Sequence, residues 1–378
     1  MTWPQRVFAR PAGARRLGRT VPEGRRADVP RLLKMQGCQG NTLPAAPRRA
    51  RCCLHVENPS MKARVVIVGS YVQDLSFYVA EFARPGETLP ADLRPGAGGK
   101  GFNQAVAATQ AGVPTLFIGA IGHDAAGAGA RDFARQHGVR AEFVVKKKEP
   151  TGVASIAINA AGQNQILVAL GANLALHIRD VPIRPLTGAE VVVCQAESDM
   201  KTAAHVLRTA RRQGAVTIFN PAPMHAKVDL AILRHVEVLI PNEAEFVALV
   251  NRSPRSGLKN FTTEALLRLA PDRLHALCRT FNVPIVIVTL GARGCFVSQP
   301  DVYARVNAHG VDAVDTTGAG DAFVGGFAAG LVKFNKNVFE AAHFANAVAA
   351  LAVTRHGTAS GMPTAREIAR FLRRRDHA

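Results

Sequence analysis

Short apolar segments rich in valine and isoleucine alternate with amphipathic segments from residue 64 onward. Continuous apolar runs of about four to eight residues are typical of strands that are buried on both faces of a sheet. We expect such strands at residues 65–69, 115–122, 191–195, 216–220, 236–242 and 284–291.

Between these runs, apolar residues recur at helical spacing. We expect helices at residues 103–112, 200–214, 242–250 and 262–281. Pro271 lies inside the last segment, and proline interrupts the helical hydrogen-bond ladder, so we expect a break there. Repeated strand–helix–strand units predict an α/β fold, a three-layer sandwich with a central, mostly parallel sheet that helices cover on both faces.

Two segments depart from this alternation and lack an adjacent crossover helix. Residues from about 75 to 97 are extended and interrupted by proline, and residues from about 151 to 172 predict two strands with a turn near Ala161. We expect them to form a small β-sheet lid over a site. Because open strand edges favour pairing, we also expect a homodimer that forms through this lid.

Polar residues or glycines follow several predicted strands. They include Asp74, Asn220, Asn242 and Gly291. In open parallel sheets, ligands bind outside the carboxyl ends of the strands. We therefore expect these residues at one functional edge, together with the glycine turn at residues 318–321.

Charge is unevenly distributed along the chain. Residues 1–60 contain 11 Arg and 1 Lys against 2 Glu and 1 Asp, so they supply +9 of the formal net charge of +19. They show no sustained apolar periodicity, and such a segment cannot offset its chain entropy by burying apolar surface. We expect a disordered, Arg-rich tail at residues 1–60 and a folded domain at residues 61–378.

Two other interpretations of the tail stay open. Translation that starts at Met61 would place the first strand almost at the N-terminus. An organelle-targeting segment fits the excess of arginine but not the scarcity of serine, since Ser60 is the only one in the segment.

Cysteine usage and hydropathy argue against several classes of protein. Three of the six cysteines lie in apolar segments of the domain, and no CxxC pair or Cys/His ligand spacing suggests zinc. Reduced, buried thiols are typical of cytoplasmic proteins, so we expect that location. No run of 18 uncharged apolar residues predicts a membrane span. The moderately basic domain indicates no nucleic-acid partner.

The segment VDTTGAGDAFVGGF, residues 314–327, places glycines where a loop bends into a helix. Amides at a helix start bind anions, so Gly318, Ala319 and Gly320 would form an anion hole for a phosphoryl group in transfer. Asp321 follows directly. A carboxylate there repels phosphate unless it accepts the proton of the attacking hydroxyl, which predicts a general base. A simple helix cap is the alternative for Asp321.

A second glycine-rich loop, GAGGKGFNQAVAA at residues 96–108, precedes a predicted helix. It is not a Walker A loop, because Gly101 rather than Ser or Thr follows Lys100, and no GxGxxG motif follows the first strand. Glycines, a lysine and the Asn103 amide suit a ligand with several hydroxyl groups. The alternative is a tight turn with a solvated lysine.

This loop is one of six motifs that occur in a fixed order. The others are FNPAP (219–223), PNEAE (241–245), TLGARG (289–294), DTTGAGDAF (315–323) and AVTRHGT (352–358). Together they resemble the PfkB-type sugar kinases, and most closely the ribokinase group. The resemblance runs from about residue 62 to about residue 372. It implies a ribokinase-like fold and an ATP-dependent phosphotransferase that acts on an alcohol group.

The resemblance also implies roles for single residues. Asp321 would take the proton of the sugar 5-hydroxyl as this attacks the γ-phosphate of ATP, with the amides of residues 318–320 as the anion hole. The implied sugar-binding residues are Val72, Asp74, Gly99, Lys100, Gly101, Phe102, Asn103, Glu197 and Asp321.

Nucleotide and cation sites are implied in the same way. The ATP-binding positions are Asn242, Thr289, Leu290, Gly291, Ala292, Arg293, Gly294, Gly320, Asp321 and Asn346. Asn242 and Glu245 fit an N-x-x-E pattern that is associated with Mg²⁺ and phosphate. A K⁺ site that supports the anion hole would use the Asp315 carboxylate and the backbone oxygens of Thr317, Ala352, Arg355, Gly357 and Gly361.

Two positions depart from the ribokinase pattern and bear on the substrate. Val72 stands where many ribokinases have asparagine, and Phe102 stands where they have alanine. Loss of an amide removes hydrogen bonds, while an aromatic ring offers a stacking face, which suits a purine nucleoside such as inosine, adenosine or guanosine. We expect D-ribose, because the other sugar contacts are intact; in that case Phe102 packs inward and Val72 is tolerated.

Two functions outside the kinases were weighed against this one. A sugar-binding regulator on the same fold would have lost the base or the anion hole, and both motifs are intact. Nucleic-acid binding rests on the charge of the tail alone.

Overall fold

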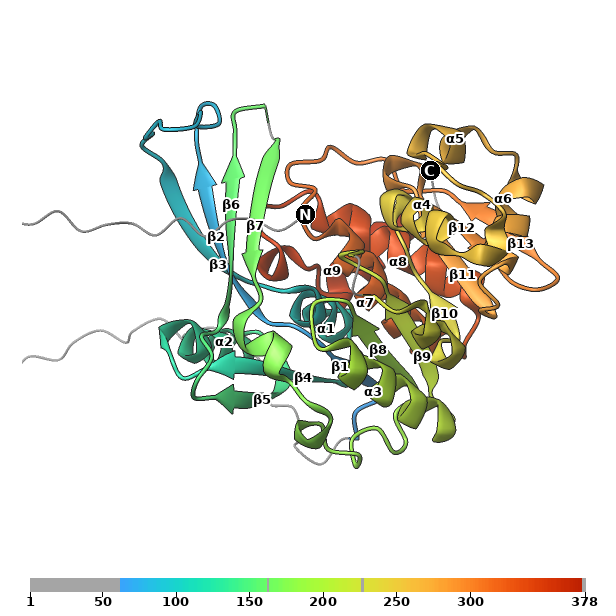
Figure 1. Ribbon diagram of the computed structural model, residues 1–378, viewed down its shortest axis with the longest axis horizontal. Helices are drawn as coiled ribbons and strands as arrows, with labels where there is room; N and C mark the ends of the chain where they lie inside the picture. The colour runs from blue at the N-terminus through green and yellow to red at the C-terminus, as the bar shows by residue number, and fades with distance from the viewer. Residues whose placement is uncertain (1–61, 162, 226–227, 376–378) are drawn as a thin grey trace, which may run out of the picture. The chain divides into compact units, whose positions relative to one another are not determined.

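The computed structural model describes residues 62–161, 163–225 and 228–375 (Figure 1). These residues form a nine-stranded sheet, a separate four-stranded sheet and the helices that cover the larger one. The expectations for residues 1–60 lie outside the described residues.

The large sheet is parallel over most of its width. The β11–β12 and β12–β13 pairs are antiparallel, and the other neighbours are parallel. In spatial order its strands are β13 (Tyr303–Val306), β12 (Cys295–Ser298), β11 (Ile285–Thr289), β10 (Val238–Leu239), β9 (Val216–Asn220), β8 (Val191–Gln195), β1 (Val65–Val68), β4 (Thr115–Gly122) and β5 (Arg140–Lys146).

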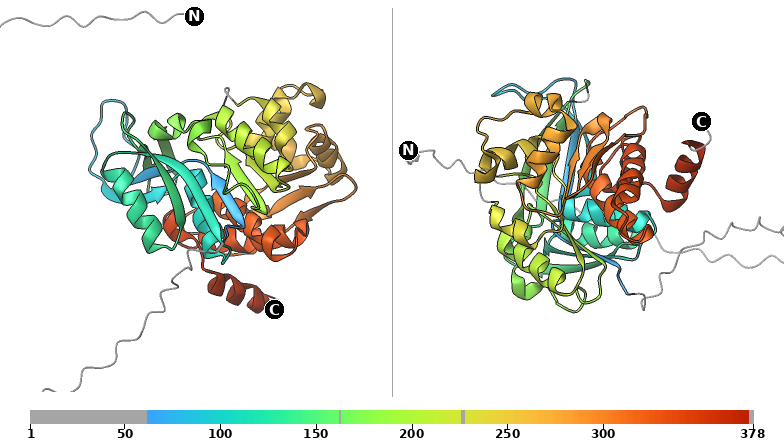
Figure 2. Two further views of the ribbon diagram at one scale, coloured as in Figure 1. Left: turned by 90° about the horizontal axis from the view of Figure 1, so that it is seen from below. Right: turned by 90° about the vertical axis from the view of Figure 1, so that its right-hand side faces the viewer.

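Helices cover both faces of this sheet, which confirms the expected three layers. Along β1, Val65 and Ile67 pack into one apolar core, whereas Val66 and Val68 pack into the other. Figure 2 shows α4 to α6 and α7 to α9 on opposite sides of the sheet. The helices are α1 (Lys100–Gln110), α2 (Ala125–Gln136), α3 (Met200–Arg212), α4 (Glu243–Arg252), α5 (Thr263–Arg268), α6 (Pro271–Arg279), α7 (Ala319–Lys333), α8 (Val338–Ala352) and α9 (Ala365–Arg375).

The expected break at Pro271 is confirmed. The helix α5 ends at Arg268, and α6 begins with Pro271 in its first turn. A proline is tolerated there because the first amides of a helix have no acceptor within it.

The small sheet contains β3 (Asp92–Gly98), β2 (Val72–Tyr78), β6 (Gly152–Ile158) and β7 (Asn164–Ala169), in that spatial order. Both irregular segments of the sequence therefore form strands of one separate sheet, as expected. The expectation for Asp74 was wrong in its placement: it lies within β2 and not after a strand of the main sheet. The chain passes from β1 into β2 over only three residues, 69–71, and so carries Asp74 into the small sheet.

Among the described helices, none is both long and apolar enough to cross a membrane. Cys194, Cys278 and Cys295 are free thiols and all three are buried.

Candidate active site

Asp321 lies in the first turn of α7, three residues after the left-handed Gly318, whose φ is 81°. A side chain at that φ would be strained, which accounts for the glycine. The Asp321 carboxylate accepts hydrogen bonds from Asn103 Nδ2 and Gln104 Nε2 of α1, both at 3.0 Å. The helix-cap interpretation is therefore wrong, because Asp321 is oriented by another helix and Gly318 occupies the cap position.

The turn before Asp321 offers part of the predicted anion hole. The Ala319 amide donates to the Thr316 carbonyl at 3.2 Å, so in this conformation it is engaged within the protein. The first hydrogen bond that enters α7 runs from the Ala322 amide to the Gly318 carbonyl. The amides of Gly320 and Asp321 precede it and have no acceptor in their own helix. Among the amides of this turn, these two are therefore the donors left for a ligand.

The loop before α1 faces this turn. Gly99 has a φ of 88°, and a Cβ on Gly101 would lie 2.7 Å from the Ser70 amide nitrogen, so both positions require glycine. The close approach brings the Lys100 amide to Glu197 Oε2 at 2.9 Å. The same carboxylate oxygen accepts a hydrogen bond from Ser70 Oγ at 2.6 Å. Glu197 and Lys100 are thus fixed beside each other, as the resemblance implied.

One lysine lies among four carboxylates in this region. Burial acts to lower the pKa of Lys100, but the surrounding Asp321, Glu197, Glu245 and Asp74 carboxylates outweigh it and raise that pKa. Burial also raises the pKa of Asp74 to about 6 and raises the pKa values of Glu197 and Glu245. The site is therefore rich in hydrogen-bond acceptors around one buried lysine.

Two adjoining cavities border these residues. One, of about 150 Å³, is lined by Asp74 and Ile156 of the small sheet and by Thr358. The other, of about 160 Å³, is lined by Lys100 and by residues 318–321. Asn103 Oδ1 is buried and has no hydrogen-bond partner within the described residues. It is an open acceptor beside Asp321, which suits a sugar hydroxyl.

Neither Val72 nor Phe102 lines these two cavities, although Val72 packs against Ile156, which does. Phe102 is fully buried, and its ring packs edge-on against Tyr71 and Phe117. Val72 packs in the small sheet against Ala154 and Ile156. The aromatic face that suggested a nucleoside is therefore used by the core. Phe102 interdigitates there with rings from three other elements, which local sequence does not reveal.

Asn242 and Glu245 line the second cavity together with Thr289. Asn242 Oδ1 accepts a hydrogen bond from the Glu245 amide at 2.8 Å, and Glu245 Oε2 accepts one from the Asn242 amide at 3.0 Å. This reciprocal pair is a capping box at the start of α4, which gives the N-x-x-E pattern a structural reason of its own. Asn242 also bridges to Thr289 at the strand ends.

The remaining ATP positions implied by the resemblance differ in their surroundings. Gly291, Ala292 and Arg293 form an exposed turn after β11. Leu290 is buried in the core, and the Asn346 side chain donates to the carbonyls of residues 306 and 307, each at 3.0 Å. Gly294 has a φ of 81°, and a Cβ there would lie 2.1 Å from the Val306 carbonyl oxygen. The Leu290 and Asn346 side chains are thus engaged within the protein.

The segments that carry the implied K⁺ ligands are joined to each other. The Asp315 carboxylate accepts hydrogen bonds from the Thr317 amide at 2.9 Å and the Gly357 amide at 3.1 Å. The carbonyl oxygens of Ala352 and His356 lie 3.6 and 3.7 Å from the position that a Cβ on Gly361 would occupy. Carbonyl oxygens and one carboxylate therefore gather here, and this donor set fits a monovalent cation.

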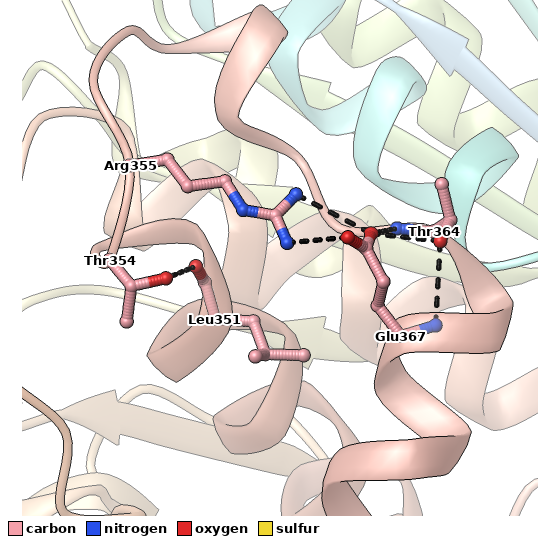
Figure 3. Close-up of polar contacts among 5 residues, drawn as sticks. All are labelled: Leu351, Thr354, Arg355, Thr364 and Glu367. Atoms are coloured by element: carbon pink, nitrogen blue, oxygen red, sulfur yellow. Dashed lines mark hydrogen bonds and ion pairs between the residues drawn. The ribbon is translucent and has the colours of Figure 1, made fainter.

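The Arg355 side chain points toward Glu367 of α9 (Figure 3). Its guanidinium pairs with Glu367 at 2.7 Å. The same carboxylate accepts hydrogen bonds from the amide and the hydroxyl of Thr364, both at 2.8 Å. The Arg355 side chain is thus engaged with α9, and the prediction for its backbone oxygen stays a prediction.

Sequence reasoning missed several residues of the site. Gln104, Gln195, Ser70 and Thr358 were not singled out, and each makes a hydrogen bond that orients one of the predicted groups or its partner. A signal existed for Gln195, since it ends the buried strand β8 at the predicted functional edge. Asn220, which was expected at that edge, accepts a hydrogen bond from Gln104.

Known proteins are similar to this chain in sequence and in fold. Residues 62–365 match the family described as pfkB family carbohydrate kinase. The chain is 33% identical to a ribokinase of Staphylococcus aureus over 82% of this chain and 99% of the relative, and 34% identical to a mouse ribokinase over 81% and 94%. The structure of an Arabidopsis thaliana ribokinase in complex with ribose and ATP is similar, with a TM-score of 0.72 and 28% identity over 82% of this chain and 99% of that one. Since the family match covers most of its length, the chain belongs to the pfkB family of carbohydrate kinases.

Proposed function

We propose that this protein transfers the γ-phosphoryl group of ATP to the 5-hydroxyl of D-ribose, which gives ribose 5-phosphate and ADP. The proposal rests on one arrangement of side chains. Asp321 lies beside the free amides of its turn, and Asp74, Glu197 and Asn103 are close by. The Staphylococcus aureus and mouse relatives named above are ribokinases, and the Arabidopsis ribokinase structure is a complex with ribose and ATP.

In the proposed step, the 5-hydroxyl oxygen bonds to the γ-phosphorus while its proton passes to the Asp321 carboxylate. The bond between phosphorus and the β,γ-bridging oxygen breaks, and ADP leaves. A carboxylate is a weak base toward an alcohol, but a loose phosphoryl-transfer transition state demands little of it. Orientation of the reactants, which supplies roughly 7–11 kcal/mol in well-aligned systems, and the amide donors of the turn carry most of the rate.

The sugar would be held by acceptors and donors on both sides. Asp74 and Glu197 accept hydrogen bonds from its hydroxyls, and Lys100 donates one. Asn103 Oδ1 accepts another, since this atom is buried and unpaired within the described residues. These groups all suit hydroxyls, and the burial of Phe102 leaves no aromatic face for a nucleobase at that position. We therefore infer ribose in preference to a nucleoside.

Two cations complete the proposal. Glu245, supported by Asn242, would hold Mg²⁺ together with the phosphates of ATP, since Mg²⁺ is commonly bound through one or two carboxylates and the substrate. A bound Mg²⁺ neutralises phosphate charge. The Asp315 carboxylate and the carbonyls of residues 317, 352, 355, 357 and 361 would hold K⁺, whose charge supports the turn at Gly318.

We also propose a homodimer that forms through the small sheet, and we propose that this sheet acts as a lid. Leu93 and Leu167, on its strands β3 and β7, are 51% and 77% exposed. Leucines that are this exposed on a sheet favour contact with a second copy of the chain.

A panel of phosphate acceptors tests the proposed function. With ATP, Mg²⁺ and K⁺, the full chain should phosphorylate ribose with a higher kcat/KM than inosine, adenosine or fructose. Asp321→Asn should reduce kcat by a factor of at least about 10³ and leave ribose binding intact, because it removes only the proton acceptor. Asp312→Asn, which changes an exposed aspartate upstream of the turn, is the matched control. Wild-type turnover by Asp321→Asn, or a preference for inosine, would contradict the proposal.

A further inference from the structure

Thr358 lies where three parts of the site meet. It belongs to the segment between α8 and α9. Its hydroxyl oxygen is 2.9 Å from Asp74 Oδ2 and 2.9 Å from the Ala97 carbonyl oxygen, both in the small sheet. On its other side, its Cα, Cβ and Cγ2 atoms lie 3.4 to 3.5 Å from the position that a Cβ on Gly318 would occupy. One side chain thus hydrogen-bonds to the Asp74 carboxylate and lies beside the turn that begins α7.

The hydroxyl of Thr358 has one proton and two acceptors. When Asp74 is ionised, the charge-assisted bond to its carboxylate is the stronger of the two. If Asp74 is protonated, it donates to Thr358, and Thr358 donates to the Ala97 carbonyl. The hydroxyl therefore has a partner in both states and stays in place.

The position of the Asp74 carboxylate is restricted by its surroundings. A Cβ on Gly98 would lie 2.2 Å from Asp74 Oδ2, so the carboxylate already fills the space above that glycine. The segment that carries Thr358 is fixed as well, by the bond from the Gly357 amide to Asp315 and by the Arg355–Glu367 ion pair. The contact between Asp74 and Thr358 thus joins two parts that are each held independently.

We propose that Thr358 is a positioning residue that aligns the sugar with the phosphoryl-binding turn. Its hydroxyl orients the Asp74 carboxylate, and its methyl group supports the turn at Gly318. This inference rests on the proposed function, in which Asp74 binds the sugar and the turn binds the transferred group.

Two substitutions separate the hydroxyl from the methyl group. Thr358→Val keeps the shape and removes the hydrogen bond, so KM for ribose should rise about tenfold while KM for ATP stays within about twofold. Thr358→Ser keeps the hydroxyl and removes the methyl group, so KM for ribose should stay near the wild-type value while kcat falls about threefold. Thr354→Val is the matched control, since the Thr354 hydroxyl, just after the end of α8, donates to the Leu351 carbonyl of that helix at 2.7 Å (Figure 3).

A pH profile adds a measurement that simple loosening of the structure would not move. Without the Thr358 donor, the ionised form of Asp74 is less stabilised, so the pKa of Asp74 rises. The acid limb of kcat/KM for ribose should therefore move to higher pH in Thr358→Val. It should stay in place in Thr358→Ser, which keeps the donor. Lys100, Glu197 and Asp321 act on Asp74 in all three proteins and are unchanged. The other charged or titratable groups that line the same cavity are Tyr78, Arg94, Asp315 and His356.

The outcomes distinguish failure of the role proposed for Thr358 from failure of the proposed function. An active wild-type enzyme with an unchanged ribose KM and pH profile in Thr358→Val overturns the inference alone. An equal rise of the ribose KM in both variants also overturns it, because shape rather than the hydroxyl would then matter. A wild-type enzyme that transfers no phosphate to ribose overturns the proposed function and the inference together. Thermal unfolding of each variant shows whether it folds.

Discussion

At the scale of single residues, the orientation of Asp321 depends on a buried chain of amides. Gln104 Nε2 donates to Asp321 Oδ1 at 3.0 Å and lies 3.1 Å from Asn220 Oδ1. Gln104 Oε1 accepts a hydrogen bond from Gln195 Nε2 at 2.6 Å. Gln104 is fully buried. A carboxylate that is held in this way needs no reorientation when the substrate arrives, which is the main source of rate in such a reaction.

Gln104→Leu should therefore reduce kcat. Leucine has a similar volume, but it removes a hydrogen-bond donor from Asp321 and a partner from Gln195 and Asn220. We therefore expect kcat to fall by a factor of about 10 to 100, while KM for ATP changes little. Gln110→Leu is the control on the same helix, because Gln110 bonds to the His137 carbonyl away from the site. Steady-state kinetics of both variants test this. Equal kcat values in Gln104→Leu and the wild type would show that Asp321 is oriented without it.

At the scale of elements, the close contact of α1 and α7 sets the distance between Gln104 and Asp321. A Cβ on Gly325 of α7 would lie 2.3 Å from the Gln104 carbonyl oxygen and 2.7 Å from Ala107 Cβ. On the next face, a Cβ on Gly326 would lie 2.9 Å from Val348 Cβ of α8. The two glycines let α7 pack between its neighbours at short range, so the helix that carries Asp321 has a fixed position.

Gly325→Ala should displace α7 from α1. The gain in helix propensity is about 1 kcal/mol, and overpacking against backbone typically costs about 1–3 kcal/mol, so the free energy of unfolding should fall. Because Asp321 moves with α7, kcat should fall as well. Gly129→Ala in α2 is the control, since its nearest neighbour is the Gln73 side chain at 3.8 Å, and it should be neutral or stabilising. Denaturant unfolding and kinetics measure both; a variant as stable and active as the wild type would contradict the argument.

The elements that sequence predicted well are those with a local signal. The strands β4, β8 and β9 have the expected bounds because parallel strands buried on both faces are continuously apolar. The strand β10 is only two residues long where seven were expected, because an apolar run does not reveal where strand pairing ends. The edge strands β5 and β13 were not predicted, since half of their residues or more are not buried and their patterns are weak.

The same distinction holds for the site. The glycine turns and Asp321 were predicted because backbone torsions at a turn are a local requirement. The partners of Asp321 and Asp74 were not, because Gln104 lies 217 residues from Asp321 and Thr358 lies 284 residues from Asp74. Only the fold brings them together, and no spacing in the sequence indicates it.

At the scale of the whole molecule, the small sheet has two different faces. Asp74, Ser76 and Tyr78 line the cavity beside Thr358, so the intervening Leu75 and Phe77 point to the opposite face. In the register of the small sheet, Leu93 of β3 pairs with Phe77 of β2. Leu167 of β7 and Leu75 of β2 pair with the same residue of β6, from its two sides. The face turned away from the site therefore carries several apolar side chains, with Ser155 between Leu75 and Leu167, and these apolar side chains are the basis of the proposed dimer.

Leu167→Asp should weaken that dimer. A carboxylate in an apolar contact between two copies is desolvated without a partner, so the variant should be monomeric at concentrations where the wild type is a dimer. Leu174→Asp, at a 56% exposed leucine outside the small sheet, should leave the dimer intact. Size-exclusion chromatography with light scattering over a range of concentrations measures this. A monomeric wild-type protein would contradict the proposal directly.

The carboxylates around Lys100 also affect which form of the nucleotide, free or bound to a divalent ion, enters the site more readily. Asp321, Glu197, Glu245 and Asp74 surround Lys100, so carboxyl groups outnumber the ammonium group inside the site. An unchelated triphosphate meets repulsion there, and one whose charge a divalent ion has partly cancelled meets less. Activity should therefore follow the chelated share of the nucleotide pool rather than its total, and an excess of chelator should slow the enzyme even when nucleotide is abundant.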